Sequence, residues 1–322
     1  MKKIKPNTTK YEFWPFWLFY TPFVPYWIWN SIKARSFSYF CNVNSGIKFG
    51  GFLDYSKSKI MCQIPSRFKP VSRYILHKKD LKNLPQFPFI VKPDLGERGI
   101  NVELIQTLED WANYPLNKNL IIQEYLDFSH EFGVFYAKLP QKEKGEILSI
   151  TGKEFLTYTA DGKSTLQEFI SQNPRTQNRI DYLKERFISE WEIILPKGTV
   201  LYLEPIGNHN RGTRFFDASH LISEELTHVL NEISQNIKGF NYGRFDVKAN
   251  SEEDLKKGNL KIIEINGANS EPTHIYDSKY TLIQAYREVK RHLDIQYEIA
   301  IKQPRNHSST AFYKAVIKRV FS

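Results

Sequence analysis

Cysteine is nearly absent from this sequence, since only Cys41 and Cys62 occur among 322 residues. Both lie in apolar stretches, and they lack the spacing of a metal site or of a disulfide framework. A cysteine-held metal centre and a disulfide-stapled fold are therefore excluded. A reducing, cytoplasmic setting is the simplest expectation.

Acidic residues are scarce at both ends of the chain. Residues 1–40 hold six cations and one acid, Glu12, and residues 301–322 hold five cations and no acid. These ends account for the net charge of +10, so the chain is not one continuous basic surface for duplex DNA, and no nucleic-acid partner is expected. Basic ends indicate instead an anionic partner such as a membrane surface.

Low-complexity linkers and internal repeats are also missing. The composition, 41% hydrophobic and 25% charged, excludes a disordered or collagen-like chain and is ordinary for a globular enzyme. The length predicts two lobes or one large composite domain. Aromatic residues are plentiful, at 15% of the chain.

One uncharged aromatic segment, FWPFWLFYTPFVPYWIWNSI at 13–32, is long enough to span a bilayer. Pro15, Pro22 and Pro25 argue against a simple spanning helix, because each removes a backbone donor. No small-residue cleavage site follows, so a removed signal peptide is not expected. Three interpretations stay open: packing in the core or at a lobe interface, an interfacial membrane patch, and a true span.

The last residues, AFYKAVIKRVF, place Phe312, Val316 and Val320 four apart with cations elsewhere around the helix. This pattern predicts a basic amphipathic helix. Such a helix either docks on the body of the protein or lies on an anionic bilayer.

The rest of the chain alternates between strand and helix patterns. Strands are expected at 87–93, 100–105, 120–125, 131–139, 242–248 and 260–266. Helices are expected at 107–114, 164–171, 179–188, 223–237 and 280–302. A capping box of Thr107 and Asp110 opens the first of these helices, and a polar turn is expected between the last two strands.

The last two strands carry the sharpest chemistry. Side chains alternate along a strand, so Arg244 and Asp246 share one face, as do Glu264 and Asn266. Paired strands would gather two carboxylates and an amide oxygen beside a guanidinium. Such oxygen ligands suit Mg²⁺, and the arginine suits a phosphate or an oxyanion. The alternative is a surface hairpin with a salt bridge.

An earlier strand ends at Lys92, directly before the sequence PDLGERG. Gly96 and Gly99 let backbone amides approach phosphate oxygens closely. The sequence is not a Walker loop, because no Gly-Lys-Ser/Thr follows. An ordinary turn is the alternative.

The order of these motifs resembles the ATP-grasp enzymes. The motifs are FIVKPDLGERGINV, LIIQEYLDFSHEF, YGRFDVK and KIIEINGANSEP. The sequence at 57–275 is similar to that of D-alanine:D-alanine ligases. DGKSTLQEFI and YLEPIGNHNRGTRFFD look more like the ATP-grasp module of cyanophycin synthetase. The resemblance implies an α+β fold whose two α/β lobes grip ATP between antiparallel sheets.

The resemblance also implies a role for individual residues. Expected ATP contacts are Lys57, Lys92, Gly96 and Gly99 for the phosphates, Glu124 and Leu126 for adenine, and Glu131 for ribose. Expected metal ligands for one or two Mg²⁺ ions, or Mn²⁺, are Asp246, Glu264 and Asn266. Arg244 and Lys153 would stabilise the transferred phosphoryl group and the acyl phosphate.

The implied activity is ATP- and Mg²⁺-dependent joining of a carboxylate to an amine through an acyl phosphate. A kinase-like ATP-grasp phosphotransferase and a non-catalytic ATP-binding module are the alternatives. Expected substrates are small or lipid-linked carboxylates and amines. We expect a monomer or homodimer in the cytoplasm, with the inner membrane face as a peripheral contact.

The expected division is an aromatic-rich region at 1–84, which serves as a substrate or membrane-proximal lobe, an ATP-grasp domain at 85–300 and a basic helix or tail at 301–322. The acid that D-alanine ligases use near their start has no counterpart here, so D-alanine is not the expected substrate. The sequence NGANSEPTHIYD follows the metal strands and suggests an amine pocket, with loop capping as the alternative. Candidate substrate residues are Ser270, Glu271 and His274 in this segment, with Asn208 and Arg211 from an earlier loop.

Overall fold

The computed structural model describes residues 10–81, 83–96, 99–176, 179–207, 211–305 and 307–320. The chain forms two units. The first comprises Met1–Pro70, Phe128–Gly152 and Phe216–Ser322, and the second comprises Val71–Asp127 and Lys153–Phe215. Helices accompany antiparallel sheets in both, so the expected α+β class is confirmed. The division at 84 and 300 stays a prediction.

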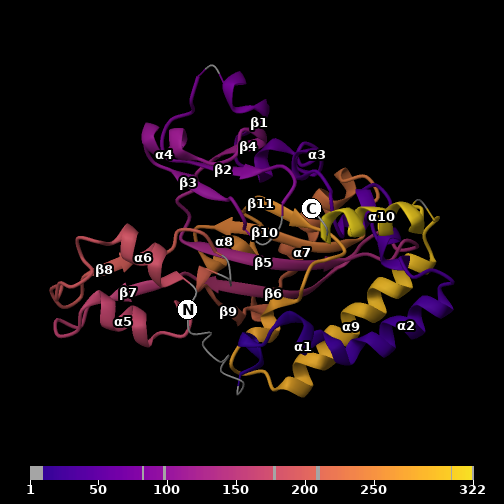
Figure 1. Ribbon diagram of the computed structural model, residues 1–322. Helices are drawn as coiled ribbons and strands as arrows, with labels where there is room; N and C mark the ends of the chain where they lie inside the picture. The colour runs from indigo at the N-terminus through magenta and orange to yellow at the C-terminus, as the bar shows by residue number, and fades with distance from the viewer. Residues whose placement is uncertain are drawn as a thin grey trace. The chain divides into compact units, whose positions relative to one another are not determined.

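A five-stranded sheet forms the centre of the first unit, in the order β11-β10-β5-β6-β9 (Figure 1). Its strands are β5 (His130–Ala137), β6 (Glu146–Glu154), β9 (Arg214–Asp217), β10 (Tyr242–Ala249) and β11 (Lys261–Asn266). β10 pairs antiparallel with β5 on one side and with β11 on the other. β10 is therefore an interior strand paired on both sides, which fixes the direction of every side chain along it.

Helices bury both faces of this sheet. On one face, Val134 and Tyr136 pack into a cluster with Leu230 of α7 (Glu224–Asn236), alongside α3 (Lys57–Met61) and α8 (Glu252–Lys256). On the other, Phe135 packs with residues of α9 (Leu282–Ile301) and α10 (Ser309–Val320). The continuous apolar run of β5 follows from this two-sided burial.

The aromatic segment is broken into short helices. Pro15 is the N-cap of α1 (Phe16–Tyr20), and Pro22 and Pro25 lie in the first turns of the 3-10 helix η2 (Thr21–Phe23) and of α2 (Val24–Lys33). Proline is tolerated there because a first-turn N–H has no partner inside the helix. Among the described residues, no helix combines the length and the apolarity needed to cross a bilayer.

The second unit contains a four-stranded antiparallel sheet in the order β1-β4-β2-β3. The strands of this sheet are β1 (Ser72–His77), β2 (Phe89–Pro93), β3 (Glu103–Ile105) and β4 (Lys118–Glu124). The unit also contains a separate two-stranded sheet of β7 (Thr157–Thr159) and β8 (Val200–Tyr202). Its helices are α4 (Leu108–Asn113), α5 (Leu166–Gln172) and α6 (Ile180–Arg186). The predicted capping box of Thr107 and Asp110 at α4 is confirmed.

Two local predictions need correction. The strand expected from residue 100 begins at Glu103, because the chain turns at Gly99 and Asn101, both of which have positive φ. The link between β10 and β11 is not merely a polar turn. The side chain of Ser251 caps the N-terminus of the short helix α8. The first turn of α8 contains acidic residues, which the positive end of the helix dipole stabilises.

Candidate active site

The register of β10 and β11 brings the predicted metal residues together. Arg244 lies opposite Asn266, and Asp246 lies opposite Glu264. Because β10 alternates, Phe245 and Val247 enter the core beneath α7 while Arg244 and Asp246 face the other way. The expected pairing of these strands is therefore observed.

Arg244 and Asp246 form a buried, two-pronged ion pair. Arg244 Nε lies 2.6 Å from Asp246 Oδ1, and Nη2 lies 3.1 Å from Oδ2. Burial lowers the pKa of Arg244, but the neighbouring Asp246 carboxylate raises it more, so the net shift is upward. A permanent positive charge is thus fixed at this end of the sheet.

Lys57 provides a second cation beside the carboxylates. Its Nζ, on the buried helix α3, lies 3.1 Å from Glu264 Oε1. Asn266 Nδ2 donates to Asp246 Oδ2 at 3.4 Å, and Tyr55 OH donates to Asn266 Oδ1 at 3.3 Å. Each carboxylate therefore has a cation within ion-pair distance.

This donor set fits a hard cation. Asp246, Glu264 and Asn266 supply carboxylate and amide oxygens on one face of two paired strands, which is the ligand chemistry of Mg²⁺. Within the described ranges, no three His, Cys, Asp or Glu side chains gather as a metal site. Magnesium, if held here, depends on two carboxylates, the amide oxygen and the oxygens of a phosphate substrate.

Glu271 lies next to this cluster and is held by two tyrosines. Tyr276 OH donates to Glu271 Oε1 at 2.6 Å, and Tyr20 OH donates to the same oxygen. Arg244 Nη1 donates to the Glu271 carbonyl oxygen at 3.3 Å. Burial, then the Glu271 charge, raises the pKa of Tyr20 and of Tyr276, so both hydroxyls stay protonated as donors.

Tyr20 is the residue that sequence reasoning missed. It belongs to the aromatic segment, 251 positions from Glu271, and no local motif marks it. The sequence marked Tyr20 only as one of many aromatic residues in the segment 13–32, which gave no indication of a contact with Glu271. The structure joins this segment to the candidate substrate residues.

The other two candidates of this segment have structural contacts. Ser270 Oγ donates to the Gly267 carbonyl oxygen at 2.6 Å. His274 is buried, with Nε2 3.9 Å from Glu288, and burial lowers its pKa although Asp217 and Glu288 oppose the shift. His274 is therefore a neutral imidazole near pH 7.

The first unit also carries Glu131 and the second carries Lys153. Glu131 is buried on β5, opposite Lys248 of β10, and Lys153 is half-buried on β6. Their roles toward ribose and phosphate stay predictions.

The residues of the second unit that were predicted to bind nucleotide lie on β2, β4 and the following loops. Lys92 is buried and donates to Gln123 Oε1 at 3.1 Å. Glu124 is exposed and accepts the Val71 N–H at 3.0 Å, and Leu126 is buried two residues later. The side-chain amide of Gln123 thus holds the Lys92 ammonium.

Arg211 supports the glycine turn of this unit. It donates to the carbonyl oxygens of Gly99 at 3.0 Å and Val102 at 2.9 Å, while pairing with the buried Glu204 at 3.2 Å. Arg179 pairs with the same carboxylate at 2.8 Å. Gly99 has φ +68°, a conformation that favours glycine. Gly96 does not have a positive φ. Asn208 lies outside the described residues.

Comparison with known proteins gives a likeness to solved structures only. No family model and no curated protein matches the chain. It is similar to a bifunctional glutathione synthetase from Pasteurella multocida, with 14% identity and a TM-score of 0.39 over 73% of this chain and 36% of that one. It is similar to a D-alanine–D-alanine ligase from Bacillus anthracis, with 13% identity and a TM-score of 0.41 over 77% and 67%.

A third likeness is to a carboxyaminoimidazole ribonucleotide synthase from Aspergillus clavatus. Identity is 8% and the TM-score 0.40, over 70% of this chain and 47% of that one. The chain thus matches about a third of the glutathione synthetase, about half of the synthase and about two thirds of the ligase.

Proposed function

We propose that the chain is an ATP- and Mg²⁺-dependent ligase that joins a carboxylate to an amine through an acyl phosphate. The observation that carries the proposal is the register of β10 and β11, which sets Asp246 and Glu264 side by side with Arg244 and Lys57. The ordered motifs of the sequence support the same reading. The proposed reaction consumes ATP, so a cytoplasmic location is part of the same proposal.

The chemistry follows from these charges. A substrate carboxylate oxygen attacks the terminal phosphorus of ATP, the bond to the bridging oxygen breaks, and ADP leaves. The amine then attacks the acyl carbon, and phosphate leaves as the amide forms. A bound Mg²⁺ supplies Lewis-acid stabilisation of the phosphoryl oxygens.

The residues of this chain have separate tasks in that sequence. Arg244, a fixed cation, stabilises negative charge on the acyl phosphate and the tetrahedral intermediate. Lys57 and Lys92 bind phosphate oxygens once these displace their present partners, Glu264 and Gln123. Glu271, whose Oε1 accepts both tyrosine hydroxyls, presents a carboxylate to an incoming ammonium.

The test is ADP release from ATP and Mg²⁺ with a panel of amino acids, dipeptides and hydroxy acids. Asp246→Asn and Glu264→Gln keep side-chain shape but remove charge, and we expect each to lower kcat by about a hundredfold or more. Glu253→Gln is the matched control, because Glu253 is exposed on α8 and pairs only locally with Lys256. An unchanged rate in both site variants would contradict the proposal.

The product identifies the reaction class. An amide of the two substrates, found by mass spectrometry, supports the ligase. A phosphate ester would instead establish the kinase-like alternative. Nucleotide binding with no turnover on any panel member would reduce the protein to an ATP-binding module.

A further inference from the structure

Helix α2 has an inverted hydrophobic pattern. Asn30 and Ser31 are only 2% and 1% exposed, whereas Trp29 and Ile32 are each 59% exposed. A helix on the surface of a protein in water normally turns its apolar stripe inward. The outward apolar stripe of α2 therefore indicates a surface that meets something other than water.

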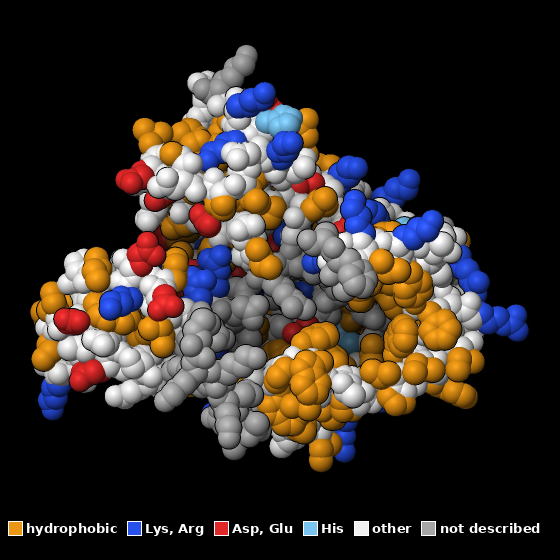
Figure 2. All heavy atoms as spheres, in the orientation of Figure 1, with side chains coloured by type: hydrophobic (Ala, Val, Ile, Leu, Met, Phe, Trp, Pro, Cys, Tyr) orange, Lys and Arg blue, Asp and Glu red, His pale blue; other side chains and the backbone are white. Residues whose placement is uncertain are grey.

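This apolar surface extends beyond α2. Its other exposed members are Phe16, Trp17 and Leu18 on α1, Val24 and Ile28 on α2, and Phe37 just after it. Figure 2 shows hydrophobic side chains gathered over α1 and, beside them, over the region of α2. We call the exposed apolar residues between Phe16 and Phe37 the aromatic face.

The inner side of the same helices is firmly anchored. Phe19 of α1 is buried against Val289 of α9, and Tyr26 of α2 donates a hydrogen bond to Asp294 of α9. Lys33 lies over the ring of Tyr297, 4.7 Å from its centroid. The aromatic face is therefore the outer side of a packed layer, not a loose segment.

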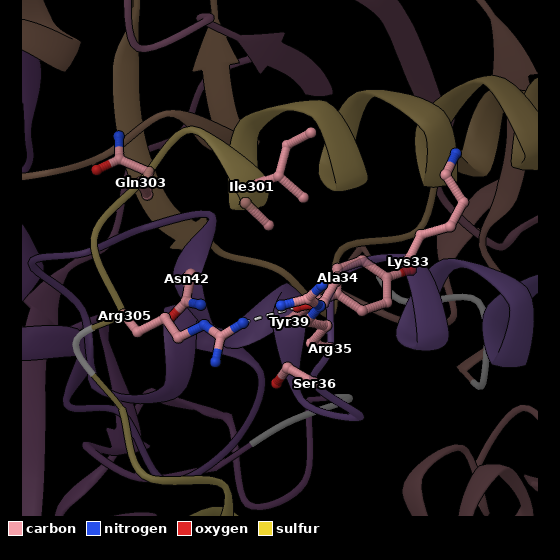
Figure 3. A pocket seen from close by; sticks show the side chains of 10 residues that line it. Lys33, Ala34, Arg35, Ser36, Tyr39, Asn42, Ile301, Gln303 and Arg305 are labelled. Carbon is pink, nitrogen blue, oxygen red and sulfur yellow. Dashed lines mark hydrogen bonds between the residues drawn. The ribbon is translucent and has the colours of Figure 1, made fainter.

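The charges on the segment that forms the aromatic face are of one sign. No acid occurs between Glu12 and Asp54, and the cations within the range 16–37 that contains the face are Lys33 and Arg35. A cavity of about 240 Å³ opens where α2 ends, and Lys33, Arg35 and Arg305 line it without any carboxylate (Figure 3). Such a cavity attracts an anion.

Two contacts show how the cavity is built. Arg305 donates to the carbonyl oxygen of Ala34 at 2.9 Å, which holds its guanidinium at the end of α2 although 271 positions separate the two residues (Figure 3). Asn42, buried in the cavity wall, has an amide oxygen without a hydrogen-bond partner among the described residues. The wall of the cavity is therefore built from both ends of the chain, with Arg305 fixed in place at the end of α2.

We propose that this side of the first unit docks on a bilayer that contains anionic phospholipid. The aromatic face enters the interfacial layer, where Trp and Tyr rings are favoured, and Lys33, Arg35 and Arg305 bind headgroup phosphates at the cavity. A second copy of this chain is a poorer occupant, because two faces of a protein with net charge +10 would bring like charges together.

The first test is sedimentation of the full chain with vesicles at low salt. We expect pelleting with phosphatidylcholine mixed with phosphatidylglycerol, and about tenfold weaker binding to phosphatidylcholine alone. Added salt weakens binding to the mixed vesicles, because screening acts on the headgroup contacts.

Matched variants separate the two contributions. Lys33→Glu with Arg35→Glu should lower binding to mixed vesicles by about tenfold or more, whereas Lys184→Glu with Lys197→Glu, both exposed in the second unit, should not change it. Trp17→Ser with Trp29→Ser should lower binding to both vesicle types. Tyr202→Ser, 69% exposed on β8, is the apolar control.

A second measurement locates the rings. Phospholipids brominated on the acyl chain quench tryptophan fluorescence only where a ring reaches the apolar layer. We expect quenching in the wild type, and its loss in Trp17→Phe with Trp29→Phe although that variant still pellets. Quenching that persists in this variant would overturn the assignment of the aromatic face.

Two other outcomes also overturn the proposal. The first is an absence of pelleting with mixed vesicles at low salt. The second is a dimer in sedimentation equilibrium that Trp17→Ser with Trp29→Ser converts to monomer, which would make a second copy the occupant. Circular dichroism and a thermal melt confirm that each variant is folded.

Discussion

Glu271 connects the aromatic segment near the start of the chain to β10 and to the segment that follows β11. Its Oε1 accepts hydroxyls from Tyr20 of α1 and Tyr276, while its carbonyl oxygen accepts from Arg244. Tyr20→Phe removes one charge-assisted hydrogen bond, and we expect it to lower the free energy of unfolding by about 1–3 kcal/mol. Urea denaturation measures this loss.

Tyr202→Phe is the control for that variant, because Tyr202 is exposed on β8. Its midpoint in urea should equal that of the wild type. If Tyr20→Phe matches it, the hydroxyl contributes nothing to stability and Glu271 is held by Tyr276 alone.

His292 makes stability depend on pH. Burial lowers its pKa to about 3, and its Nδ1 lies 2.9 Å from Tyr242 OH. Between that value and the ordinary pKa near 6.5, the unfolded chain binds a proton that the folded chain refuses. The free energy of unfolding therefore falls as the pH drops below about 6.5, by up to about 1.4 kcal/mol per pH unit for this one histidine.

The measurement is a series of urea denaturations between pH 7 and about pH 4, where the folded imidazole stays neutral. His292→Gln should reduce the dependence of the free energy of unfolding on pH by the equivalent of about one bound proton. Because the slope is compared, a uniform loss of stability in His292→Gln does not affect the result. A slope equal to that of the wild type would show that His292 titrates normally.

Elements with a short sequence period were the ones that the sequence could predict. Arg244 and Asp246 lie two apart, as do Glu264 and Asn266, and a period of two places each pair on one strand face whatever surrounds it. The pairing of Lys57 with Glu264 could not be predicted, because it depends on how α3 packs beside β11. Strands β1, β6, β7, β8 and β9 were not predicted, because their hydrophobic patterns are short or mixed.

The amphipathic pattern of the last helix was predicted, and burial decides between its two interpretations. Phe312 of α10 is buried, and its ring lies 5.4 Å from that of Phe40 and 5.5 Å from that of Phe49. The apolar side of α10 thus docks on the body of the first unit. Phe312→Ala should lower the free energy of unfolding by about 3–5 kcal/mol, because it leaves a cavity among aromatic rings.

Ile317→Ala is the matched control on the same helix, since Ile317 is 57% exposed. Thermal denaturation of both variants should show a lower Tm for Phe312→Ala only. Equal melting temperatures would mean that α10 is detached in solution.

At the scale of the whole molecule, counting charges located the basic ends but not their meeting point. Lys33 and Arg35 come from one end of the chain and Arg305 from the other, and the fold of the first unit brings them to one cavity. No sequence period connects positions this far apart. Lys33, Arg35 and Arg305 come together because α2 packs against α9.

Helix α1 links that layer to the candidate active site. Phe16 and Trp17 belong to the aromatic face, and Tyr20, one turn later, reaches Glu271. Contact of Phe16 and Trp17 with a bilayer limits the residual motion of the packed helix α1, so Tyr20 and Glu271 lose less freedom when an amine binds at Glu271. We therefore expect mixed phosphatidylcholine and phosphatidylglycerol vesicles to lower KM for the amine by up to about tenfold, with KM for ATP unchanged.

The measurement is the rate of ADP release at varied amine concentration, with and without vesicles. The result is the ratio of the KM for the amine without vesicles to the KM with them. Lys33→Glu with Arg35→Glu should bring this ratio to one at low salt, whereas Lys184→Glu with Lys197→Glu should keep the wild-type ratio. A ratio of one for a wild-type protein that pellets with the vesicles would show that bilayer docking does not affect amine binding at Glu271. Docking would then stand while its coupling to Glu271 through α1 fails, because Tyr20 would already be fully ordered in water.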